Sequence, residues 1–198
     1  MIPRSPVEPV LDDPAGVSGY PPLDDLLSDT FDGNRLYDCT ILETSWGDAI
    51  EGIALEATLI AAADTASATV DDFDAILEQD LEDWQGLLLA GLDIGVAGTV
   101  LALSAAGCAT STSCRGHHTG KPSPYEVPEV VFWADIQRAR AVQEVAASTG
   151  CCFGVDDEGR ASVWAPSVVE IMALAKELAA RRETFEGLDG GPFGQGRE

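Results

Sequence analysis

The sequence predicts an α/β domain in which helices pack on a mixed sheet, with an α+β arrangement as the alternative. The chain has 198 residues, enough to bury one sizeable core but short for two. Two acidic, amphipathic helical patterns occupy the region before residue 94. From there on the pattern runs helix, strand, strand, helix, hairpin, helix, and this order favours a sheet covered by helices.

The two ends of the chain differ in composition from the centre. Six prolines and scattered acids in residues 1–30 disfavour regular structure, so we expect a disordered or loosely docked acidic arm there. Residues 31–186 are expected to form the single α/β domain, with a short strand over 36–43. The glycine-rich residues 187–198 are expected to be a flexible tail.

The first acidic helix is expected to start at Asp48 and to run for about 16 residues. Its apolar residues recur three or four positions apart, which is typical of a helix with one buried face. Asp48, Glu51 and Glu56 lie largely off that stripe. The stripe consists of Ile50, Ile53, Ala54, Ala57, Ile60 and Ala61.

The second acidic helix is expected to begin near Thr69, a suitable N-cap. Asp71 and Asp72 then fall in the first turn, where carboxylates interact favourably with the helix dipole. The face opposite its apolar stripe is almost wholly acidic, which is typical either of a solvated face or of a docking surface for a basic protein. The candidate partner-binding residues on this face are Asp74, Glu78 and Glu82.

The second half of the chain alternates apolar runs with turn signals. Asp93 is expected to cap a helix that is apolar nearly all round and therefore buried. Gly107 and Gly150 are suitable left-handed residues at helix ends, and the acidic turn before Gly159 predicts a hairpin. The expected elements are a helix over 94–106, strands over 108–114 and 128–133, a helix over 134–149, hairpin strands over 151–155 and 160–164, and a helix from 166 to about 185.

The charge is strongly negative and unevenly distributed. The net charge is −23, and residues 1–93 carry 21 acids against two basic residues, while residues 94–198 carry 13 against nine. Such a field repels nucleic acid backbones over a Debye length of about 8 Å at physiological salt. Nucleic-acid binding by the N-terminal half is therefore disfavoured, and a basic protein partner is favoured. The simpler alternative is that the charge only keeps the protein soluble.

The sequence predicts a cytoplasmic protein that does not enter a membrane. The first residues lack the apolar core of a signal peptide, and Asp93 interrupts the longest apolar run, which is too broken for a span of about 20 apolar residues. The odd number of five cysteines favours reduced thiols. Abundant Gly and Ala with scarce Lys indicate a bacterium of high genomic GC content.

Residues 108–118 concentrate the reactive groups, since they hold two of the five cysteines and both histidines. A strand is expected to give way to a loop here, and open α/β folds place ligands at such points. A metal would use Cys114 and His117 with Cys108, His118 or the pair Cys151 and Cys152. Because no second pair with metal-ligand spacing exists, no metal is assigned.

Two other chemistries are open to the same segment. In the first, Cys114 is a nucleophile, with His117 or His118 as its base and Arg115 lowering the pKa of the thiol. In the second, the loop binds an anionic group such as phosphate or carboxylate without reacting with it. The candidate ligand-binding residues are Ser113, Arg115, Gly116 and His118. A purely structural strand end remains the alternative to both.

The pattern Thr110-x-x-Ser113-Cys114-x-Gly116 resembles a segment of the tRNA wybutosine-synthesising methyltransferase family. It also looks like small uncharacterised bacterial and phage α/β proteins with a Thr-x-x-Ser-Cys-x-Gly-His motif. The methyltransferase resemblance implies S-adenosylmethionine and a tRNA substrate. This chain departs from that family in having His117 where the family has Arg, and in its acidic first half.

Three functions follow as expectations. The first is a small bacterial or phage accessory protein that binds an anionic ligand or protein group at the Ser113–His118 loop. The second is an acidic protein-interaction module, such as an inhibitor, an immunity-type factor or a nucleic-acid mimic. The third is an enzyme that uses Cys114 or has methyltransferase-like activity. Cofactor and oligomeric state are left open.

Overall fold

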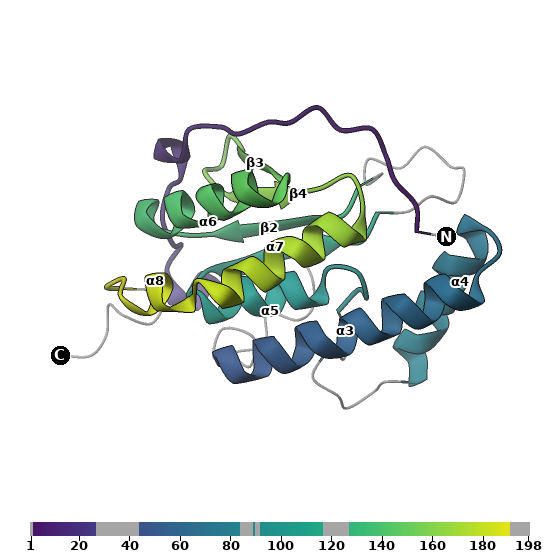
Figure 1. The fold of residues 1–198 in the computed structure, drawn as a ribbon. Coiled ribbons are helices and arrows are strands. Elements are labelled where there is room, and N and C mark those ends of the chain that lie inside the picture. The colour runs from purple at the N-terminus through teal and green to yellow at the C-terminus, as the bar shows by residue number, and fades with distance from the viewer. Residues whose placement is uncertain (1, 27–43, 84–88, 90–91, 117–126, 191–198) are drawn as a thin grey trace.

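The computed structural model describes residues 2–26, 44–83, 89, 92–116 and 127–190 (Figure 1). The strand expected over 36–43 and most of the expected tail lie outside the described residues. No helix in the described part of the chain combines the length and the apolar character needed to cross a membrane.

A four-stranded sheet forms one layer of the molecule. Its strands run in the order β1-β2-β4-β3, and each neighbouring pair is antiparallel. Leu11 adds one parallel bridge to Phe153 at the edge of β3. The predicted packing of helices on a sheet is therefore confirmed. Because all neighbouring strands are antiparallel, the α+β alternative fits the sheet better than an α/β fold. The strands are β1 (Ala109–Cys114), β2 (Glu129–Trp133), β3 (Cys152–Val155) and β4 (Ala161–Trp164).

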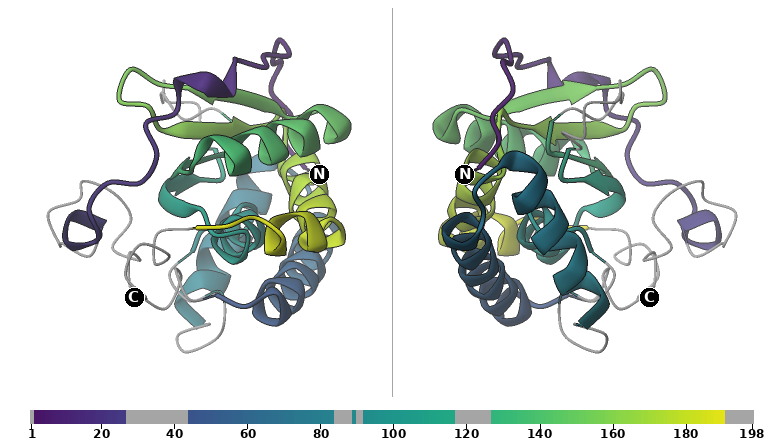
Figure 2. Two further views of the ribbon diagram at one scale, coloured as in Figure 1. Left: turned by 90° about the vertical axis from the view of Figure 1, so that its left-hand side faces the viewer. Right: turned by 90° about the vertical axis from the view of Figure 1, so that its right-hand side faces the viewer.

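The expected element order from residue 94 is confirmed, since α5, β1, β2, α6, β3, β4 and α7 follow one another. α5 packs against β1, α3 and α7, and α6 packs against β3 and α7. Figure 2 shows α3 on the side of α5 and α7 that is turned away from the sheet. The helices are α3 (Trp46–Ala66), α4 (Val70–Asp83), α5 (Ala97–Ala105), α6 (Ile136–Thr149), α7 (Val168–Ala180) and α8 (Arg182–Glu186).

The helix α5 is at the centre of the core. All its residues from Ala97 to Ser104 are buried, as its apolar sequence predicts. It begins at Ala97, however, and not near residue 94, because Gly95 adopts a φ of +117° in a preceding turn. The N-cap residue of α5 is Val96, whose apolar side chain cannot accept a hydrogen bond from the amides of the first turn.

A carboxylate from α3 supplies that cap. Oε1 of Glu56 accepts a hydrogen bond from the Gly95 amide at 2.7 Å, and Oε2 accepts one from the Gly98 amide at 3.0 Å. The side chain of Glu56 is fully buried, although the residue lies off the apolar stripe predicted for this helix. The free amides and positive dipole at a helix start stabilise a buried carboxylate. Burial still raises the pKa of Glu56 to about 7, against the opposing effect of these hydrogen bonds.

The buried face of α3 is rotated from the expected stripe. Ile53 and Ile60 are buried as expected, whereas Ile50 is 43% exposed and Ala54 and Ala61 face solvent. Alanines lie on every side of this helix, so apolar spacing alone does not identify its inner face. The helix is also longer than expected, because a capping box between Ser45 and Asp48 starts it at Trp46.

The N-terminal arm contacts the rest of the molecule at several points. It includes η1 (Pro14–Gly16) and α1 (Leu23–Leu26). The Ser5 amide donates to the Pro166 carbonyl at 2.9 Å. Leu26 is fully buried against Ala109 and Trp133, on the face of the sheet away from the helices. The domain boundaries at residues 30 and 186 stay predictions.

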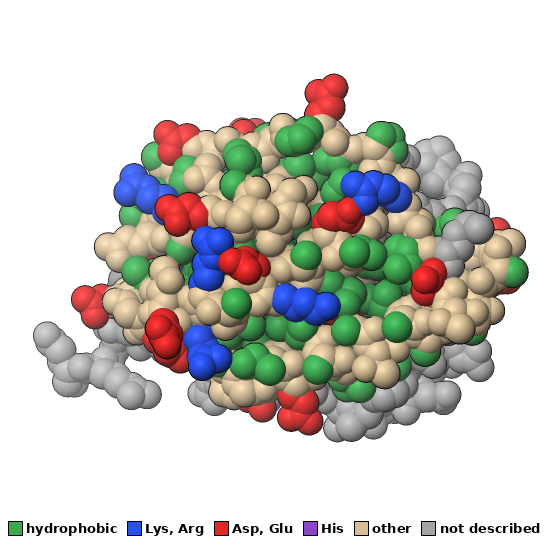
Figure 3. Space-filling view, in the orientation of Figure 1, with side chains coloured by type: hydrophobic (Ala, Val, Ile, Leu, Met, Phe, Trp, Pro, Cys, Tyr) green, Lys and Arg blue, Asp and Glu red, His purple; other side chains and the backbone are tan. Residues whose placement is uncertain are grey.

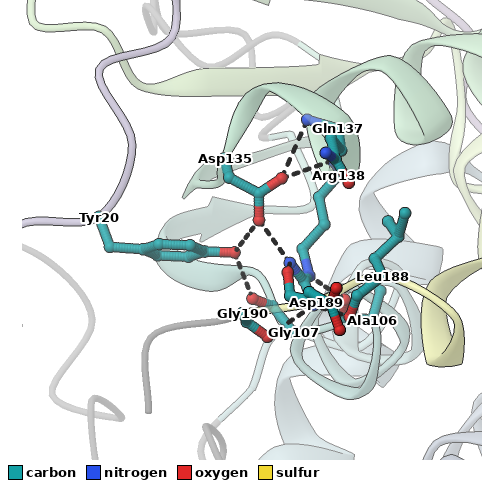
Figure 4. A network of polar contacts seen from close by, with 9 residues as sticks. All are labelled: Tyr20, Ala106, Gly107, Asp135, Gln137, Arg138, Leu188, Asp189 and Gly190. Atoms are coloured by element: carbon teal, nitrogen blue, oxygen red, sulfur yellow. Dashed lines mark hydrogen bonds and ion pairs between the residues drawn. The ribbon is translucent and has the colours of Figure 1, made fainter. Parts of the chain in front are cut away.

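A polar network joins the arm to both α5 and α6 (Figure 4). The Tyr20 hydroxyl donates to the Gly107 carbonyl at 2.7 Å and lies 3.3 Å from Oδ2 of Asp135. Arg138 forms an ion pair with Asp135 and donates to the Ala106 carbonyl at 2.9 Å. Its other nitrogen atoms donate to the carbonyls of residues 188–190 after α8. Four distant segments therefore meet at one buried guanidinium.

Candidate functional site

The predicted reactive segment lies where β1 ends. Ser113 and Cys114 finish the strand, Arg115 follows them, and Gly116 has a φ of +82°. His117 and His118 lie outside the described residues. The structure thus places the strand end as the sequence predicts, while the roles given to these residues stay predictions.

The Cys114 thiol is half-buried beside acidic neighbours. Burial raises the pKa of this thiol, and the Asp93 and Glu129 carboxylates add to that effect. Hydrogen bonding to Gly116 and the charge of Arg115 oppose it without reversing it. Arg115 was expected to produce a lowered pKa, and the net shift has the opposite direction. A protonated thiol is a poor nucleophile, so the geometry gives the enzyme hypothesis little support.

Arg115 turns inward and contacts α4. Nη2 donates to Oε1 of Glu78 at 3.1 Å and to the backbone carbonyl of Asp74 at 3.4 Å. Nε lies 3.9 Å from Oδ1 of Asp74. The predicted ligand-binding arginine is therefore brought together with two of the predicted partner-binding acids. Its charge is neutralised within the fold. Only 2% of its side chain is exposed to solvent, so an anion outside the protein can hardly reach it.

The acidic face of α4 is narrower than the sequence predicts. Asp74 was expected on the exposed face and is only 5% exposed, because Arg115 lies against it. The side chain of Glu78 is 60% exposed, and Asp71 and Asp72 face solvent. Glu82 belongs to the helix, but its side chain is outside the described part.

A row of side chains crosses the outer face of the sheet at the level of Cys114. In the strand register Cys114 pairs with Glu129, Glu129 with Trp164, and Trp164 with Cys152. Directly opposed residues project from the same face of an antiparallel sheet. The alternate positions are fully buried and form the core beneath the helices; they include Val130, Phe132, Phe153 and Val163.

A pocket of about 310 Å³ opens on this outer face; we call it the sheet pocket. A Cβ atom on Gly154 would lie 2.9 Å from the Trp164 ring and 3.3 Å from Oδ2 of Asp12. Glycine at this position therefore lets the ring and the carboxylate approach the strand backbone. The pocket is lined by Asp12, Val127, Glu129, Gly154, Val155, Asp156, Ser162 and Trp164.

The sheet pocket has almost no signature in the local sequence. Its lining comes from the arm, the entry to β2 and both strands of the hairpin, which are far apart in the chain. The one local signal is Glu129, an acid inside the apolar run of a predicted strand.

Metal binding has no assembled ligand set in the described part of the chain, where no three His, Cys, Asp or Glu side chains are grouped to hold an ion. Cys108 is fully buried, and burial raises the pKa of its thiol to about 12. Cys151 and Cys152 are buried as well. Burial also raises the pKa of the Cys151 thiol to about 11, so the thiols of Cys108 and Cys151 resist the deprotonation that metal binding requires.

Comparison with known proteins gives no relative: no protein-family model, curated protein or solved structure matches the chain. The resemblance to the wybutosine-synthesising methyltransferases therefore stays a prediction. The geometry and charge of the molecule are therefore the basis for its proposed function.

Proposed function

We propose that this protein is an acidic protein-interaction module that binds a basic partner through α3 and α4. The observation that carries the proposal is the pairing of Arg115 with Asp74 and Glu78. Because Asp74 and Glu78 neutralise the buried Arg115 guanidinium, this arginine is not free to bind an outside anion, while the Glu78 carboxylate stays exposed on α4. This arrangement favours a cationic partner over the anionic ligand first expected at the loop.

The charge distribution supports the same choice. No Lys or Arg occurs between Arg35 and Arg115, so α3 and α4 carry only negative charge. Exposed basic side chains, including Arg140, Lys176 and Arg182, lie on α6, α7 and α8, among the acidic and apolar side chains visible in Figure 3. Such asymmetry steers and orients an oppositely charged partner. The exposed acids of α3 and α4 include Asp48, Glu51, Asp64, Asp71, Asp72 and Glu78.

An acidic module of this kind would act as an inhibitor, an immunity-type factor or a nucleic-acid mimic, and its place would be the bacterial cytoplasm. In each case carboxylates occupy a basic surface that another ligand would otherwise use. Exposed charges at such an interface contribute mainly to association rate and selectivity.

Charge reversal on α3 and α4 tests the proposal. The double variant Glu51→Lys/Asp71→Lys changes two exposed acids that cap no helix and form no ion pair among the described residues. Its matched control is Glu144→Lys/Glu183→Lys, which makes the same charge change on α6 and α8. Binding is followed by fluorescence anisotropy of a labelled nine-residue arginine peptide at low salt.

We expect binding to the α3–α4 variant to be at least fivefold weaker and binding to the control to change by less than twofold. Equal weakening of both variants would show that only net charge matters. That result, or a peptide that does not bind the native protein, would contradict an α3–α4 interface.

A further inference from the structure

The sheet pocket is a second acidic site, separate from α3 and α4. Its strand residues Glu129, Gly154, Ser162 and Trp164 lie on the face of the sheet that is turned away from the helices, as their alternation with the buried core residues requires. The arm contributes Asp12, whose Oδ2 accepts a hydrogen bond from the Val155 amide at 3.4 Å. The carboxylate is thereby held against the edge of β3, beside the pocket.

The negative charge of the pocket is only partly compensated. Asp156 forms an ion pair with Arg160 at 2.7 Å. No ion pair joins Glu129 to a Lys or Arg within the described ranges. Burial raises the pKa of Glu129 above its ordinary range, although a hydrogen bond with Ser162 opposes the shift. A cation beside Glu129 would therefore relieve an unfavourable half-buried charge.

An aromatic wall completes the pocket. Trp164 is half-buried and stands next to Glu129 in the strand register. Its ring lies so close to Gly154 that a side chain at that position would collide with it. Tryptophan is the preferred aromatic partner of a cation, and planar guanidinium groups stack on its face. The volume of about 310 Å³ admits one large side chain.

We propose that the sheet pocket binds the guanidinium group of an arginine side chain from a basic protein partner. The proposal deepens the proposed function and rests on it for the identity of the partner. The guanidinium stacks on Trp164 and donates hydrogen bonds to Glu129 and Asp12. A compact ammonium group satisfies the carboxylates but does not stack in this way, so the pocket distinguishes arginine from lysine.

The test uses N-acetyl-arginine N-methylamide, whose only charge is the guanidinium. The compound is titrated into the ¹⁵N-labelled full-length protein, and shifts of the Trp164 indole and the Gly154 and Val155 amides are measured. N-acetyl-lysine N-methylamide is titrated in parallel. Glu129→Gln is the test variant, and Asp157→Asn is the control; Asp157 is an exposed acid of the same hairpin that does not line the pocket and forms no ion pair within the described ranges.

We expect saturable shifts at these three residues, at least fivefold weaker binding in Glu129→Gln, and a change below twofold in Asp157→Asn. Lysine should bind at least threefold more weakly than arginine. Equal binding of the two compounds, or shifts confined to α3 and α4, would overturn the assignment. Thermal unfolding of both variants shows that they are folded, so a lost shift reports on the pocket.

The two proposals can fail separately. If the arginine compound binds the pocket but the arginine peptide ignores α3 and α4, the proposed interface is wrong and the pocket stands. If the peptide responds to charge reversal on α3 and α4 while the pocket residues do not shift, the pocket assignment is wrong and the proposed function stands.

Discussion

A single buried carboxylate, that of Glu56, connects α3 to the start of α5. Its two oxygen atoms accept hydrogen bonds from the Gly95 and Gly98 amides, so it does the work of an N-cap from another helix. These hydrogen bonds and the helix dipole offset part of the free energy that the carboxylate loses when it is removed from water. The raised pKa of Glu56, about 7, reflects the part that is not compensated.

This residue makes stability depend on pH. Its pKa is about 7 in the folded protein and near the ordinary value of 4.5 when unfolded. The folded state therefore binds more protons between these values, and the contribution of Glu56 to the free energy of unfolding falls as pH rises from about 4.5 to about 7. Glu56→Gln should remove that decline. Urea unfolding at pH 4.5, 5.5, 6.5 and 7.5 measures the difference between variant and native protein.

Glu56→Gln should also lower stability at acidic pH, because the protonated carboxyl group keeps an oxygen atom opposite both the Gly95 and Gly98 amides, whereas the glutamine places its NH2 group against one of these two donors. An unsatisfied buried amide costs about 1–3 kcal/mol. The control is Glu51→Gln, an exposed acid on the same helix. Parallel pH profiles for native protein and Glu56→Gln would contradict the role given to this carboxylate.

The burial of Glu56 and Asp74 could not be predicted from the sequence. Asp74 lies on a face that is almost wholly acidic, and Glu56 lies off the predicted apolar stripe of its helix; both positions are typical of solvent-exposed residues. Each is buried because of one partner far away in the chain: the start of α5 for Glu56 and Arg115 for Asp74. Periodicity describes a helix face and contains no information about a distant cap or counter-ion.

At the scale of elements, the close approach of α3 and α5 depends on a glycine. A Cβ atom on Gly98 would lie 2.7 Å from Oε2 of Glu56 and 3.0 Å from Cγ1 of Ile53. Replacing a glycine inside a helix by alanine normally stabilises the helix by about 1 kcal/mol. Here the side chain would have to displace the carboxylate that caps α5.

Gly98→Ala should therefore destabilise the protein by about 1–3 kcal/mol, the usual cost of overpacking a core. Gly47→Ala provides the comparison, because Gly47 is exposed in the first turn of α3 and its added Cβ meets only Ser45 Oγ, at 3.4 Å. That variant should be neutral or more stable by up to about 1 kcal/mol. Chemical denaturation of both variants gives the two values, and a stabilised Gly98→Ala would refute the close contact.

The order of elements from α5 to α7 could be predicted because each carries a strong local signal. Examples are the apolar run of α5, the left-handed Gly150 after α6, and the acidic turn before Gly159. Strand order and the sheet pocket could not be predicted in this way. They depend on which segments meet, as when Asp12 joins Glu129 and Trp164.

At the scale of the whole molecule, the N-terminal arm is part of the packed structure in residues 2–26. Leu26 is fully buried on the outer face of the sheet, and Tyr20 reaches the end of α5. By contrast, Leu11 pairs through its backbone while 48% of the residue remains exposed. The arm therefore stabilises the domain mainly through a few buried side chains.

Leu26→Ala should reduce the free energy of unfolding by about 2–5 kcal/mol, the usual cost of truncating a buried leucine. Leu11→Ala should change it by less than about 0.5 kcal/mol, as is usual for an exposed position. Thermal or urea unfolding followed by circular dichroism measures both. If the two variants are equally stable, the arm does not pack on the sheet in solution.

The charge of the whole molecule leads to the central claim, that the protein binds a cationic partner and not an anion. The direct test compares a labelled nine-residue arginine peptide with a labelled single-stranded oligonucleotide of equal length, by anisotropy at 50 and 150 mM salt. We predict saturable peptide binding that weakens as salt rises, and no oligonucleotide binding at either salt concentration. Oligonucleotide binding without peptide binding would contradict the claim and return function to the loop after Cys114.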